Sequence, residues 1–198
     1  MDSSERSELL NRLARLEREL VSVRRDLGER NVVTLPTGVF QAVRVQVGGE
    51  HYAVPSAQVR QIIRYARVTR VPSAPRAVHG VLNLRGDVVV VLDVGERLNL
   101  GRTPLDLRTP VVVASVEGWH VGLVVERVLD VVTLDGATLT QPSGAIASSL
   151  SVAAVGSVGG QLVQLFDLAR LLSPSELEGL EGAIRDSLLP PAAAEVAE

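Results

Sequence analysis

The chain has 198 residues, 46% of them hydrophobic, and a formal net charge of -3. This length can bury a sizeable core without disulfides or structural metals. Cysteine is absent, which excludes a disulfide framework, a thiolate nucleophile and a cysteine-based zinc site. The negative charge and the low aromatic content of 3% argue against a nucleic-acid partner. No signal peptide and no stretch of roughly 20 apolar residues is recognisable, so we expect a cytoplasmic protein.

The first thirty residues carry the strongest periodic pattern. Between Ser7 and Arg30, apolar residues recur at alternating spacings of four and three, which is typical of a coiled-coil seam. These residues are Leu9, Leu13, Leu16, Leu20, Val23 and Leu27. The pattern predicts an N-terminal helix over residues 1–30 that oligomerises with itself or binds a partner helix. The seam is shorter than about three heptads, so packing of the helix against its own domain remains an alternative.

A different pattern follows a short linker, which we place at residues 31–39 because Pro36 and Gly38 prevent helix continuation. From Phe40 onward the sequence shows alternating or short Val-rich runs separated by glycine and proline turns, which is typical of an all-β sandwich or barrel. Within this region only VPSAQVRQIIRY is predicted as a short helix, with Val59, Ile62 and Ile63 on one face.

The β region contains a weak internal repeat. Residues 86–98 (GDVVVVLDVGERL) align with residues 160–172 (GQLVQLFDLARLL), which superposes Asp93 on Asp167. Each aspartate follows an apolar strand and could cap the helical turn after it. Any strand followed by a capped turn would give the same similarity, but the repeat favours two similar small barrels that share a core.

The C-terminal part is predicted to be helical and then frayed. Two Ser-x-x-Glu helix starts, at Ser173 and Ser175, precede an apolar stripe, so we expect a helix over residues 173–189. Residues 190–198 have little to bury and are predicted to form a flexible tail.

Catalytic motifs are missing. His51, His79 and His120 are scattered along the sequence without carboxylates at metal-ligand spacing, so no metal site is predicted. The chain has no lysine, so it lacks a GxxxxGK[ST] phosphate loop, and no GxSxG motif occurs. We therefore expect a protein that is not an enzyme and needs no cofactor.

One motif is not explained by packing alone. In VHGVLNLRGDVVVVLD, at residues 78–93, Arg85 interrupts a run of valine and leucine. An ionised guanidinium is costly to bury without a partner, so Arg85 either pairs internally or projects from the end of a strand. Gly86 would fit a tight turn that holds it outward. The residue types alone allow either an ordinary surface arginine or a recognition residue.

The longer segment VPSAPRAVHGVLNLRGDVVVVLDVGERLNL, at residues 71–100, resembles the signature region of the CheW-like family of bacterial chemosensory coupling proteins. The resemblance extends over residues 40–172 in the order typical of the family. It implies a mainly β fold with two SH3-like five-stranded β-barrel lobes around a shared core, flanked here by N-terminal and C-terminal helices.

The resemblance also implies a function. Members of this family bridge the cytoplasmic tip of a chemoreceptor and the regulatory domain of a CheA-type histidine kinase, in receptor arrays at the inner membrane. The receptor-binding positions carried over to this chain are Val59, Gln61, Ile62, Gly80, Asn83, Arg85 and Gly86. Kinase contact is assigned to Val111, Val112 and Val113. The expected activity is that of a non-catalytic adaptor without nucleic-acid binding or membrane insertion.

Four departures from the family pattern bear on this prediction. Gln61 replaces a common glutamate, Glu126 a common aspartate, and Val90 a proline. The heptad helix is absent from minimal family members, so we expect this chain to self-associate or to join a partner that typical couplers do not. An alternative function is an assembly or localisation scaffold that oligomerises through this helix without controlling kinase output.

Overall fold

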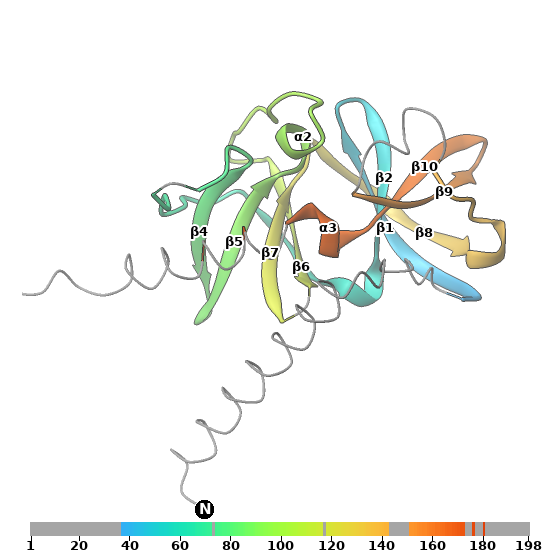
Figure 1. The fold of residues 1–198 in the computed structure, drawn as a ribbon, viewed down its shortest axis with the longest axis horizontal. Coiled ribbons are helices and arrows are strands. Elements are labelled where there is room, and N and C mark those ends of the chain that lie inside the picture. Colours follow the sequence, from blue (N-terminus) through green and yellow to red (C-terminus); the bar gives the residue numbers. More distant parts are fainter. Residues whose placement is uncertain are drawn as a thin grey trace, which may run out of the picture.

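The computed structural model describes residues 37–72, 74–116, 118–142 and 151–172, together with Glu176 and Leu180. Within these residues, ten strands form two five-stranded sheets that lie side by side (Figure 1). The strands are β1 (Val39–Val47), β2 (Glu50–Pro55), β3 (Val59–Arg64), β4 (Val78–Leu84), β5 (Asp87–Asp93), β6 (Pro110–Val116), β7 (Trp119–Val124), β8 (Arg127–Asp135), β9 (Val152–Val158) and β10 (Gln161–Phe166). Two α-helical turns, α2 (Val94–Arg97) and α3 (Leu168–Leu171), and two 3-10 turns, η1 (Ser56–Gln58) and η2 (Gly136–Thr138), complete the described elements.

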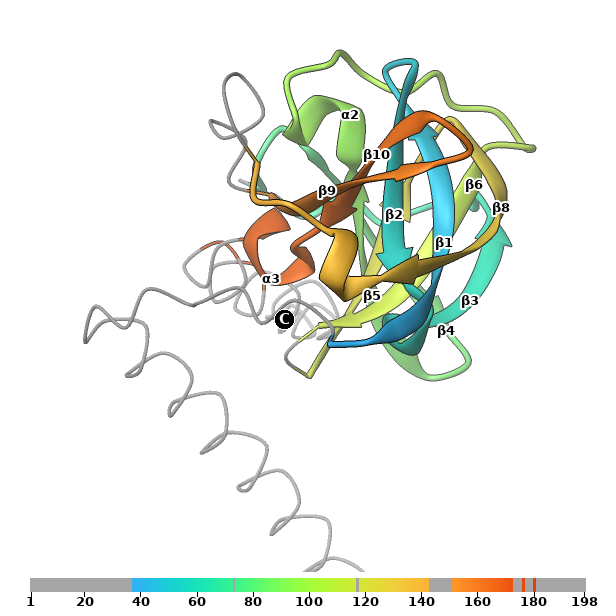
Figure 2. The same cartoon turned by 90° about the vertical axis from the view of Figure 1, so that its right-hand side faces the viewer.

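Each sheet curls so that the chain after one edge strand reaches the opposite edge. The first sheet has the order β8-β1-β2-β10-β9, and the second has the order β3-β6-β7-β5-β4. A bridge between Thr140 and Val155 joins the chain after β8 to β9. The equivalent bridge between Thr69 and Val81 joins the chain after β3 to β4. Each sheet is thus closed into a barrel, and Figure 2 shows the barrel of the first sheet facing the viewer.

The central strands are apolar on both faces because each face packs against a different core. In β5, Val89 and Val91 lie in the core of the second barrel, whereas Val90 and Leu92 lie in the core that the two barrels share. A strand covered on both sides reads as a continuous apolar run, as DVVVVLD does. The shared core also contains Tyr52 and Phe166, whose rings stack at 4.6 Å. These observations confirm the predicted mainly β fold with a shared core.

The internal repeat corresponds to a repeat of topology. Strands β3 to β7 match, in order, β8, β9, β10, β1 and β2, and this substitution converts one sheet order into the other. Asp93 and Asp167 occupy the N-cap positions of α2 and α3, as the alignment predicts. Asp93 accepts a hydrogen bond from the backbone N–H of Glu96 at 3.1 Å, and Asp167 pairs with Arg170 at 3.0 Å.

The predicted helix within residues 54–65 is wrong. The structure has the 3-10 turn η1 followed by the strand β3, in which half-buried and exposed residues alternate. A register shift between Val59 and Gln61 marks a bulge, and the strand pairs with β6. The error comes from Ile62, an exposed aliphatic residue whose position beside Ile63 and three residues after Val59 resembles the three-and-four spacing of a helix.

The two predicted terminal helices lie largely outside the described residues. This applies to the whole of residues 1–30 with its heptad leucines, and to most of residues 173–189. The two described residues of the second segment are helical. Leu180 is buried in the shared core, and Glu176 accepts two hydrogen bonds from the Arg97 guanidinium at 3.0 and 3.1 Å.

Candidate functional site

Arg85 lies at the tip of the hairpin formed by β4 and β5. Leu84 pairs with Asp87, so Arg85 and Gly86 alone form the turn. Both have positive φ, 59° and 99°, as in a type I′ turn, which suits the twist of paired strands. The Asn83 side chain accepts a hydrogen bond from the Gly86 N–H at 2.9 Å and helps to fix the turn. The guanidinium of Arg85 is thus held out at the end of the hairpin, and the residue is exposed.

Strand β3 carries the other predicted receptor-binding residues on its two faces. Ile62 is 47% exposed, so part of its side chain is available for contact. Val59 and Gln61 lie on the opposite, half-buried face, and Val59 packs against the shared core. The three residues therefore do not form a single contact face, as the predicted helix would have required.

Gly80 has a structural role within the fold. It is buried, its φ is 142°, and a Cβ atom built on it would lie 2.2 Å from the carbonyl oxygen of Thr69. This close approach allows Thr69 and Val81 to exchange backbone hydrogen bonds of 2.8 Å in both directions. Gly80 lets the chain after β3 cross closely over β4, so its place in the family pattern is explained without a receptor contact.

Val111, Val112 and Val113 have no exposed surface. They lie in β6, which is hydrogen-bonded to β3 on one side and to β7 on the other, so no backbone edge is free. A direct contact of these side chains with a kinase is therefore ruled out in this fold, and that prediction is wrong. Their register with Ile63, Ile62 and Gln61 shows that they support β3.

Three polar side chains at the hairpin end of the second barrel contact one another, and the sequence analysis did not predict these contacts. The Arg60 guanidinium contacts His120 Nε2 at 2.5 Å, and the same nitrogen lies 3.5 Å from Asp87 Oδ2. Asp87 directly follows the Arg85–Gly86 turn. The contact thus connects β3, β7 and the hairpin, and it depends on a pairing of distant strands that no local pattern reveals.

His79 also has a carboxylate companion, contrary to the sequence prediction. Its Nε2 lies 3.4 Å from Asp93 Oδ2, and the two side chains are 7% and 0% exposed. Counting back along the hairpin from Leu84 and Asp87 would place His79 opposite Leu92. In the structure the register shifts between Val78 and Gly80, and this shift is not apparent from the local sequence.

Two classes of site find no support within the described residues. No group of three or more His, Cys, Asp or Glu side chains there could hold a metal ion. Likewise, none of the helices in the described ranges has the length and apolar character needed to cross a membrane.

Comparison with known proteins gives the family. The family model described as CheW-like domain matches residues 41–176. This chain belongs to the CheW-like family. The family includes chemotaxis scaffold proteins, and the match covers both barrels and the β4–β5 hairpin.

Several named proteins match this chain over most of their own length. A chemotaxis protein CheW of Rhizobium meliloti is 31% identical over 147 residues, which are 73% of this chain and 94% of that protein. The chemotaxis protein CheW of Klebsiella aerogenes is 31% identical over 66% of this chain and 80% of its own length. Protein FrzA of Myxococcus xanthus is 28% identical over 64% of this chain and 81% of its own.

A solved structure confirms the CheW-like architecture. The scaffolding protein TtCheW of Thermoanaerobacter tengcongensis superposes with a TM-score of 0.64 over 71% of this chain and 92% of that one. Its sequence identity of 20% makes this a likeness of fold.

Proposed function

We propose that this CheW-like protein is a non-catalytic adaptor of the cytoplasm that couples chemoreceptors to a CheA-type histidine kinase in receptor arrays. The observation that carries the proposal is the exposed Arg85, held in a left-handed backbone conformation at the tip of a two-residue hairpin. Such a conformation costs a non-glycine residue about 1–2 kcal/mol. Glycine would avoid this cost, so the presence of an exposed arginine favours a contact outside the chain.

The proposed receptor contact combines the Arg85 tip with the exposed part of β3. Ile62 offers apolar area, and the neighbouring Arg60 and Arg64 are exposed on the same face. A helical receptor tip laid on such a surface would bury the isoleucine and meet arginines at the rim, a common way in which helices are recognised. Gln61 is half-buried on the other face and would support this surface.

The kinase contact is proposed at the level of the whole domain. The supporting observation is that the family match extends over residues 41–176 and so over both barrels. The bridging of receptor and kinase is what the resemblance to this family implies. Val111, Val112 and Val113 enter this proposal only as residues that hold β3 in place.

The test is a titration of the purified full chain against a receptor-tip fragment and, separately, the regulatory domain of the CheA-type kinase from the same genome. Arg85→Gly removes the guanidinium while suiting the φ of 59°. We expect Arg85→Gly and Ile62→Ala each to weaken receptor binding at least tenfold. The melting temperature should not fall in either variant, and Arg85→Gly should raise it because glycine avoids the cost of the positive φ. Arg127→Gln, an exposed arginine on β8 of the other barrel, is the control and should bind normally.

Three outcomes would contradict the proposal. If the wild-type chain bound neither partner, the coupling function would be wrong. If Arg85→Gly bound the receptor as well as wild type, the hairpin would not be the contact. If the melting temperature fell together with binding, Arg85 would be a structural residue.

A further inference from the structure

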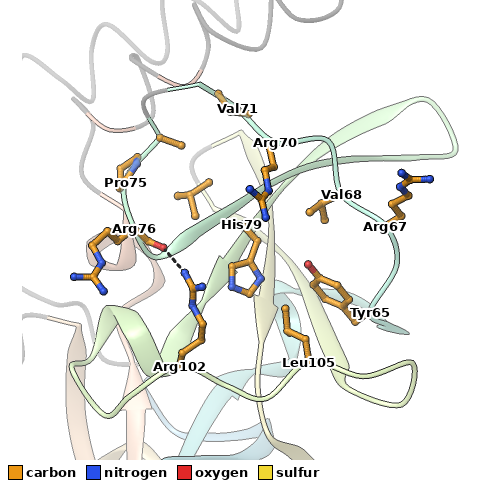
Figure 3. A pocket seen from close by; sticks show the side chains of 12 residues that line it. Tyr65, Arg67, Val68, Arg70, Val71, Pro75, Arg76, His79, Arg102 and Leu105 are labelled. Atoms are coloured by element: carbon orange, nitrogen blue, oxygen red, sulfur yellow. Dashed lines mark hydrogen bonds between the residues drawn. The ribbon is translucent and has the colours of Figure 1, made fainter.

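One feature that the coupling function does not use is a pocket beside His79. It lies between the segment that links β3 to β4 and the loop after α2, and its volume is about 530 Å³. Pockets for small molecules commonly measure about 300–1,000 Å³. Figure 3 shows His79 at its centre, with arginine side chains around it and Tyr65 and Leu105 at one side.

Four arginines line this pocket, and two of them are already paired. Glu96 contacts Arg76 and Arg102, with a separation of 3.3 Å in each case. Arg102 also donates to the Arg76 carbonyl oxygen at 3.4 Å, as the dashed line in Figure 3 marks. In the part of the chain that the structure describes, no carboxylate lies within ion-pair distance of Arg67 or Arg70. The pocket therefore carries an excess of positive charge, although the whole chain has a net charge of -3.

His79 provides a second, independent sign of a ligand. Its side chain is 7% exposed, and among the described residues neither ring nitrogen makes a hydrogen bond of good geometry. Nε2 faces Asp93 at 3.4 Å, which leaves Nδ1 without a partner. Unsatisfied polar atoms at buried positions are rare in folded proteins and call for a specific explanation. A ligand atom in the pocket is one such explanation.

The electrostatic field inside the pocket agrees with this picture. Burial raises the pKa of the Tyr65 hydroxyl above its ordinary value, whereas the positive charges of Arg70 and Arg102 act in the opposite direction. The Tyr65 ring meets His79 edge-on, with 5.9 Å between ring centres. The guanidinium charges thus act on the same space that the His79 ring occupies.

We propose that this pocket binds a small molecule that carries a phosphate or carboxylate group. Arg67 and Arg70 have free guanidinium groups, which suit the planar or bidentate recognition of oxyanions. Val68, Pro75 and Leu105 form an apolar wall for the rest of the molecule. A small ligand is favoured over an acidic polypeptide because the cavity is of small-molecule size. The site lies outside the proposed receptor contact and does not depend on the coupling function.

The test is isothermal titration calorimetry of the full chain at low ionic strength, with pyrophosphate in one arm and citrate in the other. We expect saturable binding of one anion per chain in at least one arm, and the stronger arm identifies the chemical group. The double variant Arg67→Gln/Arg70→Gln should lose at least tenfold in affinity. Both residues are exposed, so the variant should keep the melting temperature of the wild type.

The control is Arg108→Gln/Arg127→Gln, which removes the same charge from exposed positions that do not line the pocket. It should bind the anion as well as wild type. Equal losses in both double variants would mean non-specific attraction and would overturn the proposal. The absence of saturable binding in both arms would also overturn it. Polyglutamate is titrated as a further control. Binding of this polymer without binding of either small anion would indicate a site for an acidic polypeptide and would overturn the proposal.

Discussion

Asp93 joins more elements than any other single side chain discussed above. It is fully buried at the end of β5. Its Oδ1 accepts hydrogen bonds from the Glu96 N–H and the Thr103 hydroxyl, both at 3.1 Å, and its Oδ2 accepts one from the Thr103 N–H at 3.0 Å. With His79 3.4 Å away, this one carboxylate connects β4, β5, α2 and the loop that follows. A buried charge is tolerated when it is satisfied in this way.

We expect Asp93→Asn to lower the free energy of unfolding by about 2–3 kcal/mol, because charged hydrogen bonds of this kind are lost in the interior. Urea denaturation measures the change. The matched control is Asp135→Asn, since Asp135 caps the 3-10 turn η2 from a half-buried position and accepts a hydrogen bond of 3.0 Å from the Ala137 N–H. Equal losses in the two variants would show that the Asp93 network adds nothing beyond an ordinary cap.

Asp93 should also make stability depend on acid. Burial alone would raise its pKa, but the nearby His79 ring and the hydrogen bonds from Glu96 and Thr103 outweigh burial and lower it. The unfolded chain therefore binds a proton at higher pH than the folded chain does. The stabilisation is complete above about pH 4, the pKa of an unfolded aspartate, and is lost as pH falls through the folded value. Urea midpoints of wild type and Asp93→Asn should converge as pH drops below 4; parallel curves would contradict this.

At the scale of elements, the crossing of the β3–β4 connection over β4 depends on Gly80. We expect Gly80→Ala to destabilise the protein by at least about 2 kcal/mol more than Gly86→Ala. Both glycines have positive φ, but a Cβ at Gly80 would collide with the Thr69 carbonyl, whereas a Cβ at Gly86 meets nothing within 4 Å. Gly86→Ala thus reports the backbone cost alone. Urea unfolding of the two variants gives the difference, and similar values would mean that the crossing adjusts easily.

Three strands, β5, β3 and β6, show how far the sequence could predict the fold and the site. The buried strand β5 and the aspartate cap after it were recognisable, because a run of valines followed by Asp93 is a local signal. Strand β3 was not, because its exposed Ile62 gives the apolar residues a spacing that resembles a helix. The burial of Val111 to Val113 was missed because covering both faces of β6 takes two separate cores.

At the scale of the whole molecule, the N-terminal heptad pattern predicts self-association. It lies outside the described residues, so the prediction rests on the sequence alone. We expect the full chain to have at least twice the mass of a monomer by light scattering, and the chain without residues 1–30 to be monomeric with an unchanged melting temperature. Replacing Leu16 and Leu20 by glutamate should have the same effect as the deletion. Equal masses for the full and shortened chains would rule out oligomerisation through this segment.

The two sheets also differ in how the chain builds them. Strands β3 to β7 are consecutive and form the second sheet by themselves, whereas the first sheet combines β1 and β2 with β8 to β10. In the first sheet, β2 pairs with β10 in parallel. The Gln164 side chain donates a hydrogen bond of 2.7 Å to the Glu50 carboxylate, although the two residues are 114 positions apart.

During synthesis, β1 and β2 therefore leave the ribosome long before their neighbours exist. Until β10 arrives, β2 presents an unpaired edge, which is the kind of surface on which chains aggregate. The second sheet, whose strands are consecutive in the sequence, can form first from shorter-range contacts, since such contacts require less loop closure. The first sheet, which combines β1 and β2 with β8 to β10, closes last and joins the early and late parts of the domain. A chain ending before β9 would keep one complete sheet but carry an open edge that invites pairing with other copies.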